Sequence, residues 1–258
     1  MNNLAIIPAR GGSKRIPRKN IKDFLGKPII AYSIEAAINS DLFQEVMVST
    51  EDDEIGSIAR KFGANMPFIR SEKTSNDLAT TFDVIEEVIN SYKKIGKKFD
   101  NICCIYPCAP FILETQLKDA YNKLVDDNFD TVLPIVKYGF PIQRSLIKNA
   151  FGKINFFYPE YSLTRSQDLD SLFHDAGQFF WINSDACINQ KMIITPNTGC
   201  IVLSELEAHD IDNEIDWKIA ELKYEILQNQ KINWSITFIS HIFYLFITKK
   251  YVLFIFEF

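Results

Sequence analysis

The sequence has few of the features that mark secreted, fibrous or membrane-spanning proteins. Its five cysteines are irregularly spaced and describe neither a disulfide framework nor a zinc site, so we expect buried thiols in a reducing cytoplasm. The longest apolar runs in the last 25 residues are six residues long, well short of the roughly 20 that a membrane-spanning helix needs. The apolar run Leu4–Ile7 is cut off by Pro8 and Arg10, so we expect no signal peptide.

The composition is that of an ordinary globular protein. Apolar residues make up 47% and charged residues 24% of the 258 residues, which excludes wholesale disorder, collagen-like repeats and a coiled-coil rod. The length suffices for one sizeable core with a smaller attached lobe. Because the formal net charge is −5, we do not expect the chain as a whole to bind nucleic acid.

Basic residues nevertheless gather near the N-terminus. The interval from residue 10 to residue 27 holds a single acid, Asp23, and seven basic residues: Arg10, Lys14, Arg15, Arg18, Lys19, Lys22 and Lys27. A solvated basic turn would have this composition. A positive island in an acidic chain is also typical of a binding site for an anionic ligand, and we favour that interpretation.

Short apolar runs alternate with segments of helical period. We expect strands at 4–8, 45–49, 102–106, 131–136, 178–182 and 199–203. Helices are expected after Pro28, at 55–62, 82–92 and 115–126, and at 214–227 with Asp212 or Asn213 as N-cap. The alternation favours an α/β fold with a mostly parallel, doubly wound sheet and helices on both faces.

Two segments do not fit this alternation of strands and helices. Residues 138–175 are rich in aromatic residues, and we expect a small dimerisation or substrate lobe within a domain spanning 1–228, rather than a long loop. The tail, 229–258, is atypical, because residues 234–258 lack Gly and Pro. An interfacial membrane anchor and an out-of-frame extension are both open, and we assign no function there.

The segment 9–20 directly follows the first expected strand, at the edge where open parallel sheets bind ligands. Gly11 and Gly12 allow backbone amides to approach an anion closely, and Arg10 and Lys14 add positive charge. The spacing is neither that of a Walker loop nor that of the dinucleotide fingerprint. The segment therefore predicts a cradle for phosphates of a different kind.

Asp210 and Asp212 are the second chemical feature. In an extended backbone, residues two apart point to the same side, about 6.5–7 Å apart. Two carboxylates so placed suit Mg²⁺, which bridges phosphates during nucleotidyl transfer. As an alternative, Asp212 caps the following helix and Asp210 is a surface residue. Together with the cradle, we favour the metal site.

The run Ala-Arg-Gly-Gly-Ser-Lys at 9–14, followed by Ile-Pro and Lys-Asn, resembles the nucleotide-binding signature of the acylneuraminate cytidylyltransferases, or CMP-sialic acid synthetases. The resemblance covers about residues 3–228 and implies a Rossmann-like fold of the nucleotide-diphospho-sugar transferase type. It also implies CTP as co-substrate, Mg²⁺ at Asp210 and Asp212, and a homodimer. The implied nucleotide contacts are Arg10, Gly11, Gly12, Ser13, Lys14, Lys19 and Asn20, with Arg70, Asp77 and Thr80 from a segment that closes over the pyrimidine.

Other residues point to an acidic sugar as acceptor. Arg165 is suited to bind a carboxylate through two hydrogen bonds. The remaining candidate substrate residues are Tyr106, Gln167, Asp175 and Gln178. The run Asp-Ala-Gly-Gln-Phe at 175–179 resembles the pseudaminic acid branch, whereas the sialic acid branch typically reads Asn-Gly-Ala-Ile-Tyr. Sialic and legionaminic acids remain alternative acceptors.

We therefore expect in-line attack of the anomeric hydroxyl of a nine-carbon α-keto acid sugar on the α-phosphate of CTP. Arg10, Lys14 and Asp212 are the candidate catalytic residues, with Asp212 promoting loss of the acceptor proton through the metal. His174 as a base and His209 as support for a metal ligand are weaker candidates. A non-catalytic nucleotide-binding or membrane-recruited module is the alternative from a different class.

Overall fold

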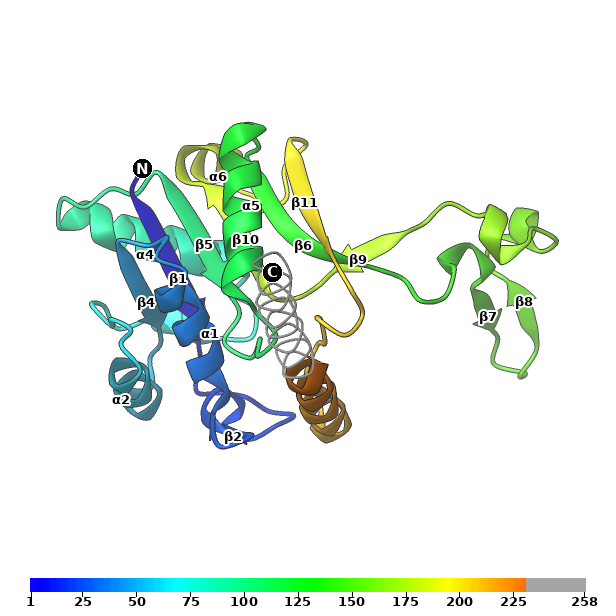
Figure 1. Ribbon diagram of the computed structural model, residues 1–258, viewed down its shortest axis with the longest axis horizontal. Coiled ribbons are helices and arrows are strands. Elements are labelled where there is room, and N and C mark those ends of the chain that lie inside the picture. The colour runs from blue at the N-terminus through cyan, green and yellow to red at the C-terminus, as the bar shows by residue number, and fades with distance from the viewer. Residues whose placement is uncertain (231–258) are drawn as a thin grey trace, which may run out of the picture.

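The computed structural model describes residues 1–230 (Figure 1). The expectations for the tail fall almost wholly on residues 231–258, which lie outside the described residues, so they stay predictions. Within residues 1–230, no helix is both long and apolar enough to cross a membrane.

A seven-stranded sheet forms the centre of the molecule, in the order β11-β6-β10-β5-β1-β4, with β9 paired to β6. Its strands are β1 (Asn3–Pro8), β4 (Glu45–Ser49), β5 (Asn101–Ile105), β6 (Thr131–Lys137), β9 (Phe173–Asp175), β10 (Phe179–Asn183) and β11 (Thr198–Leu203). β1 pairs in parallel with β4 and β5, and so does β11 with β6, whereas β9 and β10 run antiparallel to their neighbours. The expected mostly parallel α/β fold is confirmed.

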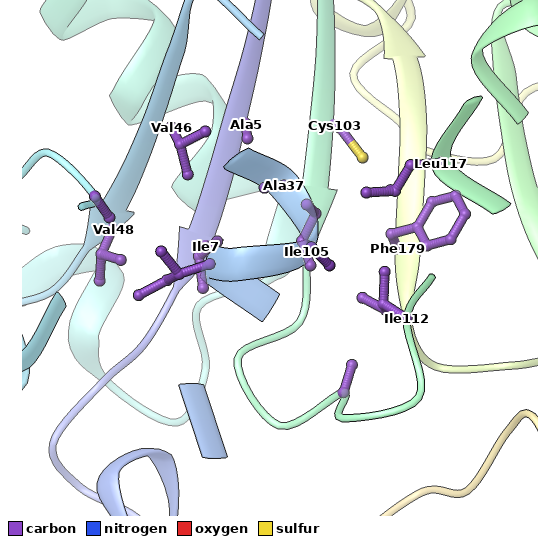
Figure 2. Packing of buried hydrophobic residues seen from close by; sticks show 14 of the residues in the cluster. Ala5, Ile7, Ala37, Val46, Val48, Cys103, Ile105, Ile112, Leu117 and Phe179 are labelled. Atoms are coloured by element: carbon purple, nitrogen blue, oxygen red, sulfur yellow. The ribbon is translucent and has the colours of Figure 1, made fainter. Parts of the chain in front are cut away.

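Helices cover both faces of this sheet, and its central strands are therefore buried on both sides. On one face lie α1 (Ile29–Asn39), α2 (Asp53–Lys61) and α5 (Glu114–Asp126), and on the other α4 (Thr81–Lys94) and α6 (Ser184–Gln190). Along β1, Ala5 and Ile7 pack into the first layer and Leu4 and Ile6 into the second, and all four are fully buried. Figure 2 shows part of the first layer, where Ala37 and Leu117 meet the sheet.

A helix at residues 214–230 closes the described part of the chain. Asn213 is its cap, because the Asn213 side chain accepts hydrogen bonds from the amides of Ile215 and Asp216, at 2.8 and 3.1 Å. Trp217 of this helix packs in a third apolar cluster with Ile16 of the first loop. Packing of the last described helix therefore places the Asp210–Asp212 motif, which directly precedes it, beside the loop that follows β1.

The smaller elements lie in the connections. They are the hairpin β2 (Asp23–Phe24) with β3 (Lys27–Pro28), the helix α3 (Glu72–Ser75), and the 3₁₀ turns η1 (Lys19–Ile21), η2 (Ile142–Arg144), η3 (Pro159–Tyr161) and η4 (Ser166–Asp168). A second hairpin, β7 (Leu146–Lys148) with β8 (Ile154–Phe156), lies in the segment 138–175.

The segment 138–175 projects away from the sheet (Figure 1). It leaves through β6, forms the β7–β8 hairpin, and returns through β9. Several of its apolar side chains are exposed, with Phe140 83%, Phe151 89% and Leu163 96% accessible. We call this segment the lobe. Exposed apolar groups in such a concentration are typical of a surface that another protein covers.

Candidate active site

A cleft of about 690 Å³ lies at the carboxyl end of β1. The strand order places β4 and β5 on opposite sides of β1, and ligands of open α/β sheets bind at such switch points. A hollow of about 680 Å³ between α1 and the last described helix is similar in size, but none of the predicted site residues lines it. The chemistry therefore favours the cleft at β1.

The cleft brings together segments that are far apart in the sequence. The predicted site residues that line it are Arg10, Ser13, Lys14, Lys19, Asn20, Asp77, Tyr106, Asp175, Asp210 and Asp212. The acidic pair and the glycine-rich loop thus share one cavity, which is the arrangement that the proposed chemistry needs. Burial raises the pKa of the Tyr106 phenol to about 12, so this side chain meets a ligand as a neutral hydroxyl.

The two glycines of the loop differ in what surrounds them. A Cβ atom on Gly11 would lie 2.5 Å from Oδ2 of Asp52, whereas one on Gly12 would meet no atom of the described residues within 4 Å. Asp52 has little freedom to move away, because Arg18 holds its carboxylate and lowers its pKa to about 2. The loop therefore needs glycine at position 11 for its close approach to Asp52, and position 12 has no such steric requirement.

This difference predicts unequal effects of two matched substitutions. We expect Gly11→Ala to raise the KM for CTP about tenfold or more, because the new methyl group displaces either the loop or the Asp52 side chain. Gly12→Ala is expected to change KM about twofold at most, since the backbone amide is retained and space is available. Steady-state kinetics at saturating acceptor would measure both. Equal effects of the two variants would contradict this account of the loop.

Three of the cations that line the cleft, Arg10, Lys14 and Arg15, meet a carboxylate. Nη1 of Arg10 lies 2.6 Å from Oδ1 of Asp77, and the Lys14 ammonium contacts the other oxygen of the same carboxylate. Lys14 and Arg10 together lower the pKa of Asp77. On the opposite wall, Nη2 of Arg15 lies 2.7 Å from Oδ1 of Asp212. Sequence reasoning assigned no partner to Arg15, because the partner lies far along the chain.

The rest of the basic island fastens the loop to its surroundings. The Lys19 ammonium donates to the carbonyl of Ile211 at 2.7 Å, so it joins the loop to the backbone between the two aspartates. Lys22 forms an ion pair with Glu214 at 2.7 Å and lies 4.6 Å above the ring of Trp217. Lys19 and Lys22 thus dock the segment that carries Asp210 and Asp212, and Lys19 also lines the cleft.

Asn20 lines the cleft, but its side chain is 5% exposed and engaged with the protein. Its Nδ2 donates to the carbonyl of Arg10 at 2.8 Å, and its Oδ1 accepts from the Cys108 thiol at 3.2 Å. Burial raises the pKa of Cys108 to about 12, which keeps the thiol protonated as a donor. Sequence reasoning missed this role of Cys108, for which residue spacing offers no signal.

Gly11 and Gly12 do not line the cleft, and neither do Arg70, Thr80 and Gln178, whose side chains bind other groups of the chain. Arg70 is buried, its guanidinium donates to the carbonyl of Thr74, and its Nε atom has no hydrogen-bond partner within residues 1–230. Thr80 caps α4 by accepting from the amide of Asp83 at 3.2 Å. The buried Gln178 side chain donates to the carbonyl of Glu207.

Arg165 and Gln167 lie on the lobe, and neither lines the cleft of its own chain. Arg165 is exposed and forms an ion pair with Asp168 at 2.7 Å. These two residues are therefore separated from the other predicted substrate residues within one chain.

His174 and His209 line a neighbouring hollow of about 530 Å³, which shares Asp175 and Asp210 with the cleft. Burial lowers the pKa of His209, so its ring is neutral near pH 7. Nδ1 of His174 lies 2.8 Å from the carbonyl of Asp175. Neither ring lines the cleft itself, so the geometry gives no support to His174 as the base.

The donor set in the cleft fits a magnesium ion that is completed by substrate. Among residues 1–230, no group of three or more His, Cys, Asp or Glu residues is arranged to hold a metal. Mg²⁺ is usually held by one or two carboxylates together with substrate phosphates and waters. Asp210 and Asp212 supply two carboxylates in the same cavity as Arg10 and Lys14.

Comparison with known proteins agrees with the chemistry that the cleft indicates. Residues 4–177 match the family model described as cytidylyltransferase. The chain is 40% identical over 226 residues to the pseudaminic acid cytidylyltransferase of Campylobacter jejuni subsp. jejuni, covering 88% of this chain and 97% of that protein. It is 29% identical over 237 residues to the CMP-N,N'-diacetyllegionaminic acid synthase of Legionella pneumophila, with coverages of 88% and 98%.

A solved structure has the same fold. The structure of CMP:2-keto-3-deoxy-manno-octonic acid synthetase complexed with CTP superposes with a TM-score of 0.64 at 17% identity. The match covers 89% of this chain and 100% of that one. At this level of identity the likeness concerns the fold.

Proposed function

The chain belongs to the cytidylyltransferase family, and from that premise we propose that it transfers CMP from CTP to the anomeric hydroxyl of a nonulosonic acid. Pyrophosphate is the second product. The observation that carries the proposal is the cleft in which Arg10 and Lys14 share one cavity with Asp210 and Asp212. Cations for a triphosphate and carboxylates for a divalent ion are the groups that nucleotidyl transfer requires.

The side chains act mainly by placing charge. Arg10 and Lys14 neutralise the phosphate oxygens as negative charge develops on the leaving pyrophosphate. The Cys108–Asn20–Arg10 hydrogen bonds hold the loop that carries both cations. Asp210 and Asp212 would hold Mg²⁺, which supplies Lewis-acid stabilisation of the phosphoryl oxygens when bound. Cys108, which lines the cleft, has a protonated thiol, and the proposal includes no covalent enzyme intermediate.

The acceptor we propose is pseudaminic acid. The support is the 40% identity to a pseudaminic acid cytidylyltransferase, against 29% to a legionaminic acid synthase. Pyrophosphate release would be measured with CTP and equal concentrations of pseudaminic, legionaminic and N-acetylneuraminic acids. We expect the highest kcat/KM with pseudaminic acid. Preference for another of the three sugars would overturn the acceptor assignment, and CTP binding without pyrophosphate release from any of them would overturn the enzyme.

The proposal includes a homodimer in which the lobe of one chain serves the cleft of the other. Arg165 is exposed on the lobe and does not line the cleft of its own chain, and the lobe presents exposed Phe140, Phe151 and Leu163. A two-fold dimer would cover these apolar groups and bring Arg165 to an acceptor carboxylate.

Complementation tests this arrangement. Lys14→Ala and Arg165→Ala are each expected to be impaired, because each removes a charge that one active site needs. Co-expression at equal levels would give half mixed dimers with one intact site of two, so about a quarter of wild-type activity should return. Mixed dimers purified with two different tags would be assayed directly. Activity no higher than the mean of the two single variants, or an active monomer by light scattering, would refute the shared site.

A further inference from the structure

Asp77 occupies an unexpected place in the cleft. Its carboxylate bridges the two cations of the phosphate cradle, with Nη1 of Arg10 at 2.6 Å from Oδ1 and the Lys14 ammonium on Oδ2. A second carboxylate lies close by, since Glu51 accepts from the amide of Gly11 at 2.8 Å. Three donors that the proposed function assigns to phosphates are therefore bound to carboxylates of the chain itself.

The turn that carries Asp77 is held by hydrogen bonds within the turn itself. The Asn76 side chain accepts from the amides of Leu78 and Ala79, at 2.8 and 3.1 Å, which shapes the turn locally. Leu78 is 90% exposed, so this side chain does not anchor the turn to the core. Asp77 contacts the cleft through its ion pairs with Arg10 and Lys14. Because its carboxylate is half-exposed, a competing anion can replace it in these ion pairs.

Arg10 and Lys14 cannot bind a carboxylate and a phosphate at the same time as tightly as they bind either one alone. The two anions repel one another, and the donors of Arg10 and Lys14 are limited in number and direction. A phosphate chain that enters the cradle must therefore displace Asp77, and the free energy of the displaced ion pairs is subtracted from its binding.

We propose that Asp77 is an internal competitor of phosphate, a residue that lowers the affinity of the cradle for any phosphate chain and favours departure of pyrophosphate. The inference rests on the proposed function for the identity of the cradle. It changes the role expected for Asp77 from the family resemblance, because a contact of the nucleotide would strengthen binding, whereas a competitor weakens it. Asp77 acts through Arg10 and Lys14, so it is a positioning residue.

Binding of inorganic pyrophosphate to the full chain tests this role without any need for turnover. Isothermal titration calorimetry with Mg²⁺ present would compare the wild type with Asp77→Asn. Exposed ion pairs are each worth up to about a fivefold change in an equilibrium constant, so we expect Asp77→Asn to bind pyrophosphate about five- to twentyfold more tightly. The gain should shrink as the salt concentration rises, because these pairs are exposed.

Glu72→Gln is the matched control. Glu72 begins α3, five residues before Asp77, and makes no ion pair within residues 1–230. The substitution therefore removes one negative charge nearby and leaves the ion pairs of the cradle in place. We expect pyrophosphate affinity within about twofold of wild type for this variant. A thermal melt of each variant would show that both are folded.

The outcomes separate the two proposals. Unchanged or weaker pyrophosphate binding by a folded Asp77→Asn would overturn the competitor role, and weaker binding would identify Asp77 as a ligand contact. Equal tightening by Glu72→Gln would overturn it too, because the effect would then be general charge. Tighter binding in a protein that transfers CMP to no acceptor would support the role of Asp77 while the proposed reaction fails.

Discussion

Replacing Lys14 with alanine is expected to lower kcat for CMP transfer about 100-fold or more, the usual cost of removing one charge that stabilises a transition state. Lys14 lines the cleft, and its side chain is 77% exposed, so alanine removes the charge without opening a cavity in the core. Pyrophosphate release at saturating CTP and acceptor would measure the effect.

Lys22→Ala is the control for this experiment. Lys22 belongs to the same basic island, but it pairs with Glu214 and does not line the cleft. We expect Lys22→Ala to reduce thermal stability slightly, through loss of the ion pair and of the contact with Trp217, while kcat stays within about threefold. A Lys14→Ala enzyme with near wild-type kcat would remove Lys14 from the catalytic residues.

The sheet could be predicted from the sequence because its strands are buried on both faces. In strands such as Asn101–Ile105 every residue is buried, and the four residues after Asn101 form a continuous apolar run that stands out from helical segments. Helices such as Thr81–Lys94 show one apolar stripe facing the sheet. Each expected strand agrees with the structure to within about one residue at its ends.

Elements with few apolar contacts were harder to predict. The strand Phe173–Asp175 has three exposed residues and pairs with β6 along one edge, so it shows no burial pattern. The helix Ser184–Gln190 is seven residues long and depends on the Asn183 cap and on the buried Cys187. Residue patterns carry little information about segments whose structure depends on such single contacts.

The candidate site, too, could be predicted in part: its local motifs could be recognised from the sequence, but its long-range contacts could not. The glycine-rich loop and the aspartate pair could be recognised from local sequence, and the structure places both in one cleft. Partners across the fold could not, because residues that are 67 apart, Arg10 and Asp77, or 192 apart, Lys19 and Ile211, meet through tertiary structure. A run of basic residues gives no indication of which members face a ligand and which face a carboxylate or carbonyl of the chain.

The docking of the last described helix links stability to the site. Ile16 and Ile211 are each 1% exposed and share an apolar cluster with Trp217, while Lys19 bonds the Ile211 carbonyl. The position of the acidic pair relative to the cradle is therefore fixed by packing on the backbone between the two aspartates. Both carboxylates line the cleft, where that of Asp212 pairs with Arg15, so a metal ion there would compete with Arg15 for Asp212.

Replacing Asp212 with asparagine should then reduce activity about 100-fold or more and raise the Mg²⁺ concentration for half-maximal rate, because a carboxylate oxygen is a far better Mg²⁺ ligand than an amide. Asp212 also pairs with Arg15, at 2.7 Å, so a change of charge balance is a competing explanation. Arg15→Gln breaks this pair but keeps the carboxylate, and we expect its Mg²⁺ requirement to be unchanged or lower.

A second measurement makes the assignment independent of turnover. In the wild type, Mg²⁺ added to the CTP complex should raise the melting temperature, since a ligand that binds the folded state stabilises it. Asp212→Asn should lose most of that increase, whereas Arg15→Gln should keep it. An Asp212→Asn protein with the wild-type Mg²⁺ dependence in both the rate and the melting temperature would show that Asp212 holds no metal, and the carboxylate would then serve as the partner of Arg15 alone.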